Sequence, residues 1–199
     1  MIAARAVTPS DAAALAQLFA AAGCSCFCRW WHFEGDDYAW QLRCAEDADA
    51  NRAELERALG DDHDEARGIV AWHGPQAVGW LKLCAPSSVA KLYGRRVYRT
   101  LGCFDGDRSR TLVIGCMLVH PAFRRRGVAT KLIESALTVA IERGADTVEA
   151  LPRCSPSPMR DDELWMGPAA TFEALGFERV DGPDPYPVLR KRRSDGGPR

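Results

Sequence analysis

The stretch that decides the fold is TLVIGCMLVHPAFRRRGVATKLIESALTVAIERGADTVEAL, residues 111–151. Its first nine residues, 111–119, are an apolar run that predicts a buried strand. Pro121 ends the run, because proline has no backbone N–H to donate to a sheet. Residues 128–142 carry apolar side chains three and four positions apart, which predicts a helix with one buried face, and Gly144 is a typical stop for it. The apolar run 147–151 predicts a further strand.

A basic turn, residues 124–129, joins the predicted strand to the predicted helix. The first N–H groups of a helix have no partner inside it, and the helix dipole adds partial positive charge there. Gly127 would leave those groups uncovered, and Arg124, Arg125 and Arg126 would add full charge. The turn lacks the Gly-Lys-Ser/Thr of a P-loop and the three glycines of a dinucleotide-binding fold. We therefore predict a phosphate or pyrophosphate site here, in preference to the more common solvated basic face.

This turn resembles the pyrophosphate-binding motif of the GNAT superfamily of N-acetyltransferases, which reads Arg/Gln-x-x-Gly-x-Gly/Ala. Arg124, Gly127 and Ala129 fall at its places, and residues 170–177, ATFEALGF, are similar to a later motif of the family. The resemblance implies an α/β (mixed α+β) fold, with a mixed central sheet of about six to seven strands flanked by helices. It also implies a single acetyltransferase domain over residues 1–190, followed by a flexible tail, 191–199.

The resemblance implies the reaction as well. An amine of a small molecule or peptide would attack the thioester of the cosubstrate acetyl-CoA directly, with no metal. A backbone N–H near Leu118 or Val119, Val119 first, would stabilise the oxyanion, and the strands would splay after Val119 to admit the pantetheine arm. The implied cofactor-binding residues lie at the strand end and in the turn: Met117, Leu118, Val119, Arg124, Arg125, Arg126, Gly127, Val128, Ala129 and Thr130.

Glu149 is the candidate general base, because the resemblance places its strand beside the thioester. It is the one carboxylate in an apolar run. Such a residue is either desolvated and able to accept a proton, or simply on the exposed face of its strand. Glu34, His120 or an ordered water are the alternatives for the base.

The general acid departs from the family pattern. Many members carry a tyrosine where this chain has Phe172, which has no proton to give. Cys154 or Tyr186 could serve instead, or the thiolate could leave into water. This departure keeps a second hypothesis open, in which the chain is a CoA-binding sensor or a catalytically degenerate module.

An aromatic segment, residues 24–37, follows the first predicted helix and reads CSCFCRWWHFEGDD. The resemblance implies that it forms one wall of the acceptor cleft, with Trp30, Trp31 and Glu34 as candidate substrate-binding residues. The alternative is that the two tryptophans only cover the sheet. The cysteines of this segment alternate, and because this is not the spacing of a structural zinc site, we predict neither a metal nor a disulfide there.

The rest of the chain sets limits. Its 199 residues and net charge of −1 suit one domain and do not suit a polyanion-binding protein. No apolar run approaches about 18 residues and no signal-peptide core is present, so we expect a cytoplasmic protein with no membrane or nucleic-acid partner. A homodimer is possible. The other predicted elements are strands at 2–7, 67–72, 77–83, 177–180 and 186–190, helices starting at Thr8 and spanning 51–59 and 167–175, and a loop or short helix at 86–110.

Overall fold

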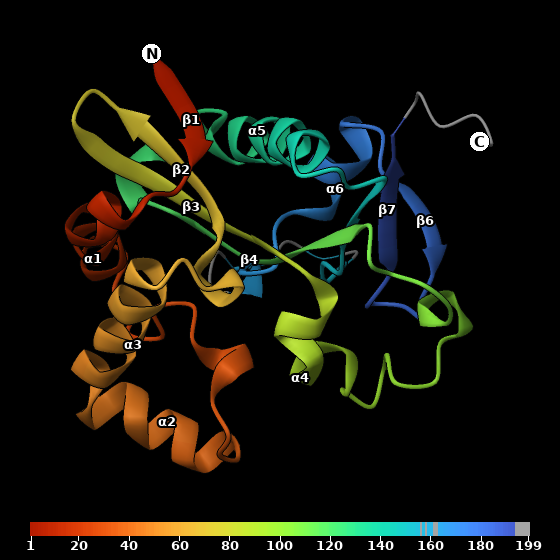
Figure 1. Ribbon diagram of the computed structural model, residues 1–199, viewed down its shortest axis with the longest axis horizontal. Helices are drawn as coiled ribbons and strands as arrows, with labels where there is room; N and C mark the ends of the chain where they lie inside the picture. The colour runs from red at the N-terminus through yellow and green to blue at the C-terminus, as the bar shows by residue number, and fades with distance from the viewer. Residues whose placement is uncertain (156, 158, 161–162, 194–199) are drawn as a thin grey trace.

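A computed structural model describes residues 1–155, 157, 159–160 and 163–193 of the chain. One seven-stranded sheet runs through it in the order β1-β2-β3-β4-β5-β7-β6 (Figure 1). The strands are β1 (Ile2–Ala6), β2 (Gly68–His73), β3 (Gln76–Cys84), β4 (Thr111–Val119), β5 (Thr147–Ala150), β6 (Glu178–Asp181) and β7 (Val188–Arg192). The β4–β5 pair is parallel and the other neighbouring pairs are antiparallel. This confirms the predicted mixed sheet of six to seven strands.

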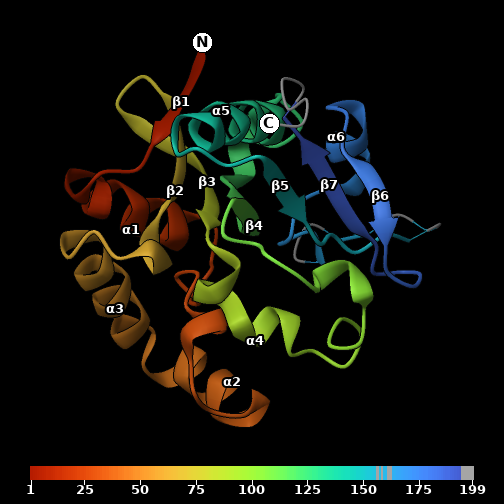
Figure 2. The same cartoon turned by 45° about the vertical axis from the view of Figure 1, so that its right-hand side comes forward.

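Helices cover both faces of the sheet. They are α1 (Ala12–Ala21), α2 (Asp37–Glu46), α3 (Ala48–Gly60), α4 (Ala90–Tyr93), α5 (Val128–Glu142) and α6 (Ala169–Ala174). Figure 1 shows α5 and α6 along the upper side of the sheet and α2, α3 and α4 along the lower side, and Figure 2 shows β5, β7 and β6 side by side. Each face therefore has its own apolar core, one under α5 and α6 and another under α1 and α3.

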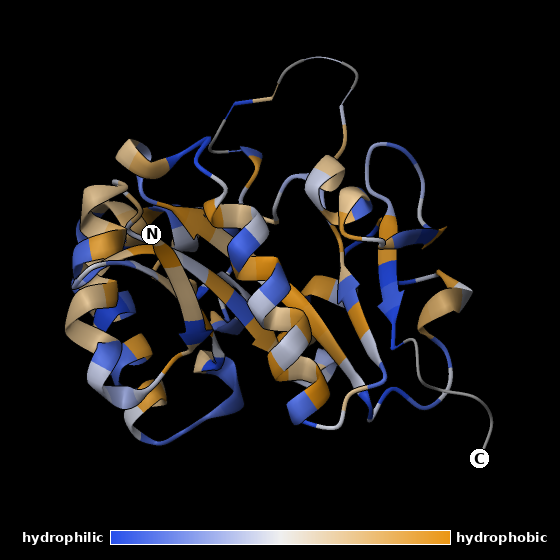
Figure 3. Cartoon of the chain, turned by 90° about the horizontal axis from the view of Figure 1, so that it is seen from above, coloured by the Kyte–Doolittle hydropathy of each residue, from blue (hydrophilic) through white to orange (hydrophobic). Residues whose placement is uncertain are grey.

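The helix α5 follows directly from the sequence pattern. Val128, Leu132, Ala136 and Ala140 are at most 2% exposed and pack on the sheet, and Figure 3 shows hydrophilic residues interspersed with these apolar ones along the helix. Gly79 lets the start of α5 approach β3, because a Cβ on this glycine would meet Cγ1 of Val128 at 2.7 Å. This close approach places the N-terminus of α5 beside the end of β4.

The strand β4 contains a β-bulge at Gly115. Lys82 of β3 pairs with Cys116, whereas Leu83 pairs with Ile114, so Gly115 has no residue opposite it. The extra residue changes which side chains face which core. Ile114 and Met117 both belong to the core under α5, although they are three residues apart, and Cys116 belongs to the core under α1 and α3.

The structure differs from the sequence predictions at two places. The helix α2 was not predicted. It buries no residue, so its sequence lacks the clear apolar stripe that would indicate a helix. The predicted boundary at residue 190 is also wrong, because Lys191 and Arg192 belong to β7 and pair with Val148 and Thr147. The rest of the predicted tail, 194–199, lies outside the described residues.

None of the helices in the part of the chain that the structure describes has the length and apolar character needed to cross a bilayer. No group of three or more His, Cys, Asp or Glu side chains in the same part is arranged to hold a metal ion.

Candidate functional site

The N-terminus of α5 is uncapped. Gly127 is its N-cap residue, in the left-handed region at φ 78°, and among the described residues no side chain accepts a hydrogen bond there. Lys131 donates the first helical hydrogen bond, to the carbonyl of Gly127 at 3.0 Å, so the amides of residues 128–130 precede the helical ladder. A Cβ on Gly127 would meet nothing within 4 Å. The glycine is therefore needed for its backbone angle, and the space in front of the amides is open.

The turn before the helix is also preorganised. His120 Nδ1 accepts a hydrogen bond from the N–H of Ala122 at 3.1 Å and so shapes the 3-10 turn Pro121–Phe123. Arg125 has a left-handed backbone, φ 58°. Arg125 and Arg126 are exposed beside Gly127, and the Arg126 guanidinium lies 5.6 Å from the ring centre of Phe123. The sequence-predicted arginines thus flank the uncovered amides, which is the arrangement that an anion requires.

The strands β4 and β5 splay apart earlier than predicted. Their pairing ends where Ile114 meets Ala150, so the splay begins at Gly115 and not after Val119. The strand β5 stops there because the chain turns away through Pro152, which cannot donate to a sheet. Residues 115–119 consequently have no β5 partner along one edge.

The direction of each backbone N–H at this edge can be assigned. The Met117 N–H points into the splay and donates to the carbonyl of Trp165 at 2.7 Å, whereas the His120 N–H points the other way, to Val78 of β3, at 2.9 Å. Because backbone groups alternate along an extended strand, the N–H of Val119 shares the edge of Met117 and that of Leu118 faces β3. Of the two predicted oxyanion donors, only Val119 therefore faces the splay.

A cavity of about 410 Å³ lies beside the splayed end of β4. Its walls come from α1, the segment after it, α2 and β4, together with one tryptophan from the loop after β5. The lining residues are Phe19, Cys24, Cys26, Trp30, Asp37, Trp40, Gln41, Cys116, Met117, Leu118 and Trp165. Among these described residues Asp37 alone carries a charge. The cavity is thus mainly apolar and aromatic, with one carboxylate.

The predicted acceptor residues occupy three different positions. Trp30 lines the cavity, and Lys91 Nζ lies 3.5 Å from its ring centre. Trp31 is 5% exposed and lies behind the wall, where its indole N–H donates to the Gly115 carbonyl at 2.7 Å. Glu34 is exposed and is not among the described lining residues. Trp30 thus lines the cavity, whereas Trp31 holds the bulge of β4 through its hydrogen bond to Gly115.

Asp37, Trp40 and Trp165 are among the lining residues that sequence reasoning did not assign to the site. Asp37 appeared only as part of an acidic flank, and Trp40 lies on the unpredicted helix α2. Trp165 comes from the loop after β5, and its ring lies 5.3 Å from that of Trp31. The aromatic composition of residues 30–40 was the available signal for the first two, whereas only the folded chain brings Trp165 to β4.

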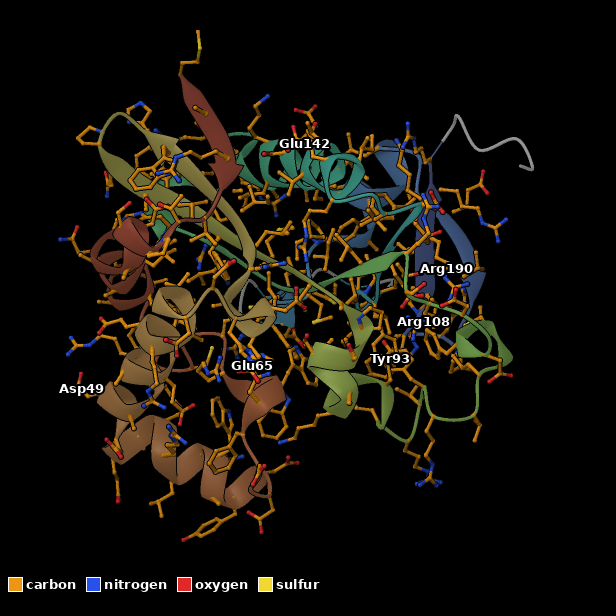
Figure 4. The ribbon with its side chains drawn as sticks, in the orientation of Figure 1. Asp49, Glu65, Tyr93, Arg108, Glu142 and Arg190 are labelled. Atoms are coloured by element: carbon orange, nitrogen blue, oxygen red, sulfur yellow. The ribbon has the colours of Figure 1, made fainter. Side chains whose placement is uncertain are left out.

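Glu149 is the centre of a buried ion-pair cluster. Its Oε1 accepts hydrogen bonds from the Tyr93 hydroxyl and Arg108 Nη2, both at 2.6 Å, and its Oε2 accepts one from Arg190 Nε at 2.7 Å. Figure 4 shows Tyr93, Arg108 and Arg190 gathered on the side of the sheet near α4 and β7. Burial, together with the adjacent carboxylate, raises the pKa of Tyr93, so its hydroxyl stays protonated and donates.

These contacts decide between the two readings of Glu149. The side chain is fully buried, so the exposed-face alternative is wrong. Its charge is matched by two arginines, and proton uptake would weaken charge-assisted hydrogen bonds on both oxygens. The role of Glu149 as a general base stays a prediction, and the cluster gives the same residue a structural role.

A buried lysine–histidine pair lies near the bulge. Lys82 is fully buried, and its Nζ hydrogen-bonds Nε2 of His32 at 2.7 Å and donates to the Glu65 carbonyl. Burial and the Lys82 ammonium lower the pKa of His32 to about 2, so the imidazole is neutral and accepts the hydrogen bond. No sequence pattern links the members of this pair, which are 50 residues apart.

Phe172 is fully buried in the core under α5. Its ring packs edge-on against Phe177, with centroids 5.2 Å apart. A Cβ on Gly167 would meet the Phe172 ring at 2.7 Å, so the ring fills the space beside this left-handed glycine. Nothing at this position can donate a proton, as the sequence indicated.

Comparisons with known proteins agree with this architecture. The chain matches the family model described as the acetyltransferase (GNAT) family over residues 29–157. Its fold is similar to that of the PaiA N-acetyltransferase from Thermoplasma acidophilum in complex with coenzyme A, at 9% identity and a TM-score of 0.55, covering 97% of this chain and 99% of that one. It is also similar to YncA from Salmonella typhimurium with acetyl-CoA, at 14% identity and a TM-score of 0.54, covering 100% and 98%.

A third solved structure has the same fold. It is an aminoglycoside acetyltransferase in complex with coenzyme A, which is 16% identical, with a TM-score of 0.53 and coverage of 97% of this chain and 95% of that one. At these identities the neighbours establish the fold alone. The family model covers more than half of the chain, and it includes the splayed strand, the basic turn and, of the tryptophans that line the cavity, Trp30 and Trp40. The chain belongs to the acetyltransferase (GNAT) family.

Proposed function

We propose that the chain transfers the acetyl group of acetyl-CoA to an amine by direct attack of the amine on the thioester. The observation that carries this proposal is the juxtaposition of two sites at one strand end. The N-terminus of α5 follows β4 through the turn at residues 120–127, and the aromatic cavity lies along the same end of β4. An anion-binding site and an acceptor site are thereby within reach of one splayed edge.

The residues present suit the cosubstrate. The amides of residues 128–130 and the guanidinium groups of Arg125 and Arg126 would hold its pyrophosphate, since both arginines are exposed and a Cβ on Gly127 would meet nothing within 4 Å. Acetyl-CoA supplies the activated acyl group. The Val119 N–H, on the splayed edge, would donate to the oxyanion that forms as the amine attacks.

The cavity indicates the kind of amine. A protonated amine would be attracted to the carboxylate of Asp37 and to the faces of Trp30 and Trp40, whose rings lie 5.4 Å apart. The apolar walls would take up the rest of a small molecule or of a peptide terminus. For proton removal, Asp37 is a stronger candidate than Glu149, because Asp37 lines the cavity and Glu149 is committed to two arginines.

A direct assay tests this function. The protein is incubated with acetyl-CoA and a panel of primary amines, and acetylated products are identified by mass spectrometry, since the eight cysteines would interfere with thiol reagents. Acetylation of at least one amine, abolished by omitting the protein, supports an enzyme. Tight binding of CoA with no product from any amine would instead support the CoA-binding sensor.

The sensor alternative has specific observations behind it. Phe172 offers no proton to the leaving thiolate, and the Met117 N–H is already held by the carbonyl of Trp165. A pantetheine arm that pairs along the splayed edge would have to displace this contact or begin at Val119. Both features suit slow turnover better than rapid catalysis.

A further inference from the structure

Two cysteines of the cavity wall lie in van der Waals contact. Cys24 Sγ and Cys26 Sγ are 3.3 Å apart, and both side chains line the cavity. The N–H of Cys28 also donates to Cys26 Sγ at 3.4 Å. The two sulfur atoms are therefore close enough to react with each other and are reached from the cavity.

Two residues with strained backbone directly follow the pair. Phe27 and Cys28 are successive non-glycine residues in the left-handed region, at φ 43° and 57°. Such residues persist only where the surrounding structure enforces them, and they concentrate at functional sites. Here Phe27 is fixed by stacking on Phe19, with ring centroids 5.0 Å apart. The turn after Cys26 is closed by a hydrogen bond from the Arg29 N–H to the Cys26 carbonyl at 2.8 Å.

The two thiols have different acid strengths. The hydrogen bond from Cys26 lowers the pKa of Cys24 against the opposing effect of burial. The same hydrogen bond, together with burial, raises the pKa of Cys26. Cys24 is thus the member that ionises first and attacks, while Cys26 keeps its proton until it resolves the product.

We propose that Cys24 and Cys26 form a dithiol that reacts with hydroperoxides and closes to a disulfide in the wall of the cavity. The thiolate of Cys24 attacks one peroxide oxygen, forming an S–O bond while the O–O bond breaks and the alcohol or water leaves. The sulfur of Cys26, losing its proton, then attacks the Cys24 sulfur. The S–S bond forms, the S–O bond breaks and water leaves. Two thiols are oxidised and one hydroperoxide is reduced, and a dithiol reductant reverses the change.

The other cysteines provide the contrast. Burial raises the pKa of Cys44, Cys103 and Cys154, and that of Cys84 to about 12, so none of them is activated. Against the opposing effect of burial, the hydrogen bond from Cys116 and the Lys82 ammonium lower the pKa of Cys28 to about 6, but Cys28 is 3% exposed and is not among the described lining residues of the cavity. Its partner Cys116 lines the cavity, and its pKa is raised. Cys24 and Cys26 are distinguished among the described residues because the thiol of lowered pKa and its partner both line the cavity.

Closing the disulfide would alter the cavity. The two sulfur atoms would move from 3.3 Å to about 2.05 Å apart. Cys26 would then pull away from the N–H of Cys28, and the segment carrying Trp30 begins only four residues after Cys26. Oxidation is therefore expected to change binding at the cavity, without touching the turn at residues 124–129.

The experiment follows thiol chemistry and does not depend on acetyl transfer. The reduced, full-length protein is treated with hydrogen peroxide, free thiols are alkylated, and the tryptic peptides are sequenced by tandem mass spectrometry. The expected result is a peptide lacking two hydrogens, in which Cys24 and Cys26 resist alkylation and Cys28 accepts it. This product should form about tenfold faster than oxidation of Cys154, which serves as the internal reference.

Three variants complete the test, each checked by thermal unfolding. Cys26→Ser should stop at a Cys24 sulfenic acid that dimedone traps, Cys24→Ser should give neither product, and Cys154→Ser should behave like the parent. A disulfide joining Cys28 to Cys116, oxidation of Cys154 as fast as that of Cys24, or an unchanged product in folded Cys24→Ser would each overturn the proposal.

Discussion

Glu149 of β5 and Arg190 of β7 are directly opposite each other in the sheet, and their side chains meet at 2.7 Å on its buried face. Arg108 joins the same carboxylate from the loop before β4. The two arginines are 17% and 15% exposed, so the cluster is largely removed from solvent. Buried pairs of this kind cost little while complete and much when one member is removed.

Glu149→Gln should therefore lower the free energy of unfolding by about 3 kcal/mol, because two partly buried guanidinium groups lose their counter-charge. Glu134→Gln is the matched control, since Glu134 pairs with Lys131 on the exposed side of α5 and its loss should cost under about 1 kcal/mol. Urea unfolding measures both. A Glu149→Gln protein of parental stability that has lost acetyl transfer would contradict the structural role and support Glu149 as the base.

Gly127→Glu should weaken CoA binding by at least about tenfold, because the new carboxylate would stand in front of the uncovered amides and repel a pyrophosphate. Gly144→Glu controls for backbone strain, since Gly144 is also left-handed, at φ 75°, has open space around it and lies past the other end of α5. Calorimetric titration with CoA compares the two. Equal affinities in both variants would remove the basis for the proposed cradle.

Asp37→Asn should raise the KM for a cationic amine several-fold and leave CoA affinity unchanged, because the carboxylate lines the cavity and not the basic turn. Glu46→Gln, at the other end of the exposed helix α2, is the control and should alter neither value. Steady-state kinetics with a cationic acceptor found in the panel provides the measurement. Unchanged KM and kcat in Asp37→Asn would show that the amine binds elsewhere.

Stability should fall on acidification through the pKa of unfolded histidine. The pKa of His32 is about 2 in the folded protein and about 6.5 when unfolded, so between these values the unfolded chain binds the extra proton. The free energy of unfolding should accordingly decrease as the pH drops below about 6.5. Urea unfolding between pH 7 and about pH 4.5 measures this slope.

His32→Gln should flatten that pH dependence, because glutamine can still accept from Lys82 Nζ and does not titrate. His63→Gln is the control, since the side chain of His63 is 62% exposed. If His32→Gln keeps the full slope of the parent, the buried imidazole is not its source and the carboxylates must account for it.

The central strand and helix could be predicted because their signals are local. The apolar run 111–119, the stripe on residues 128–142 and the glycines at 127 and 144 each act through neighbours within a few residues. The basic turn at residues 124–129 was likewise visible as a contiguous motif. Prediction succeeded where a few adjacent residues determine the backbone.

The side-chain clusters could not be predicted, because their members come from distant segments. Glu149 meets Tyr93 and Arg108 across 56 and 41 residues. Trp165 reaches β4 only after the chain has turned away from β5. The predicted position of the splay was wrong for a related reason. The splay begins where β5 stops, and no residue of β4 indicates that position.

The bulge at Gly115 decides on which face of the sheet each later side chain of β4 lies. If the strand were one residue shorter at that point, Leu118 would exchange the core under α1 and α3 for the core under α5, and Met117 would make the reverse exchange. Substitution of one apolar residue for another at positions 116–119 keeps each side chain on its face of the sheet, whereas deletion of one residue moves each of them to the opposite face. The length of this segment is thus under tighter constraint than the identity of its side chains.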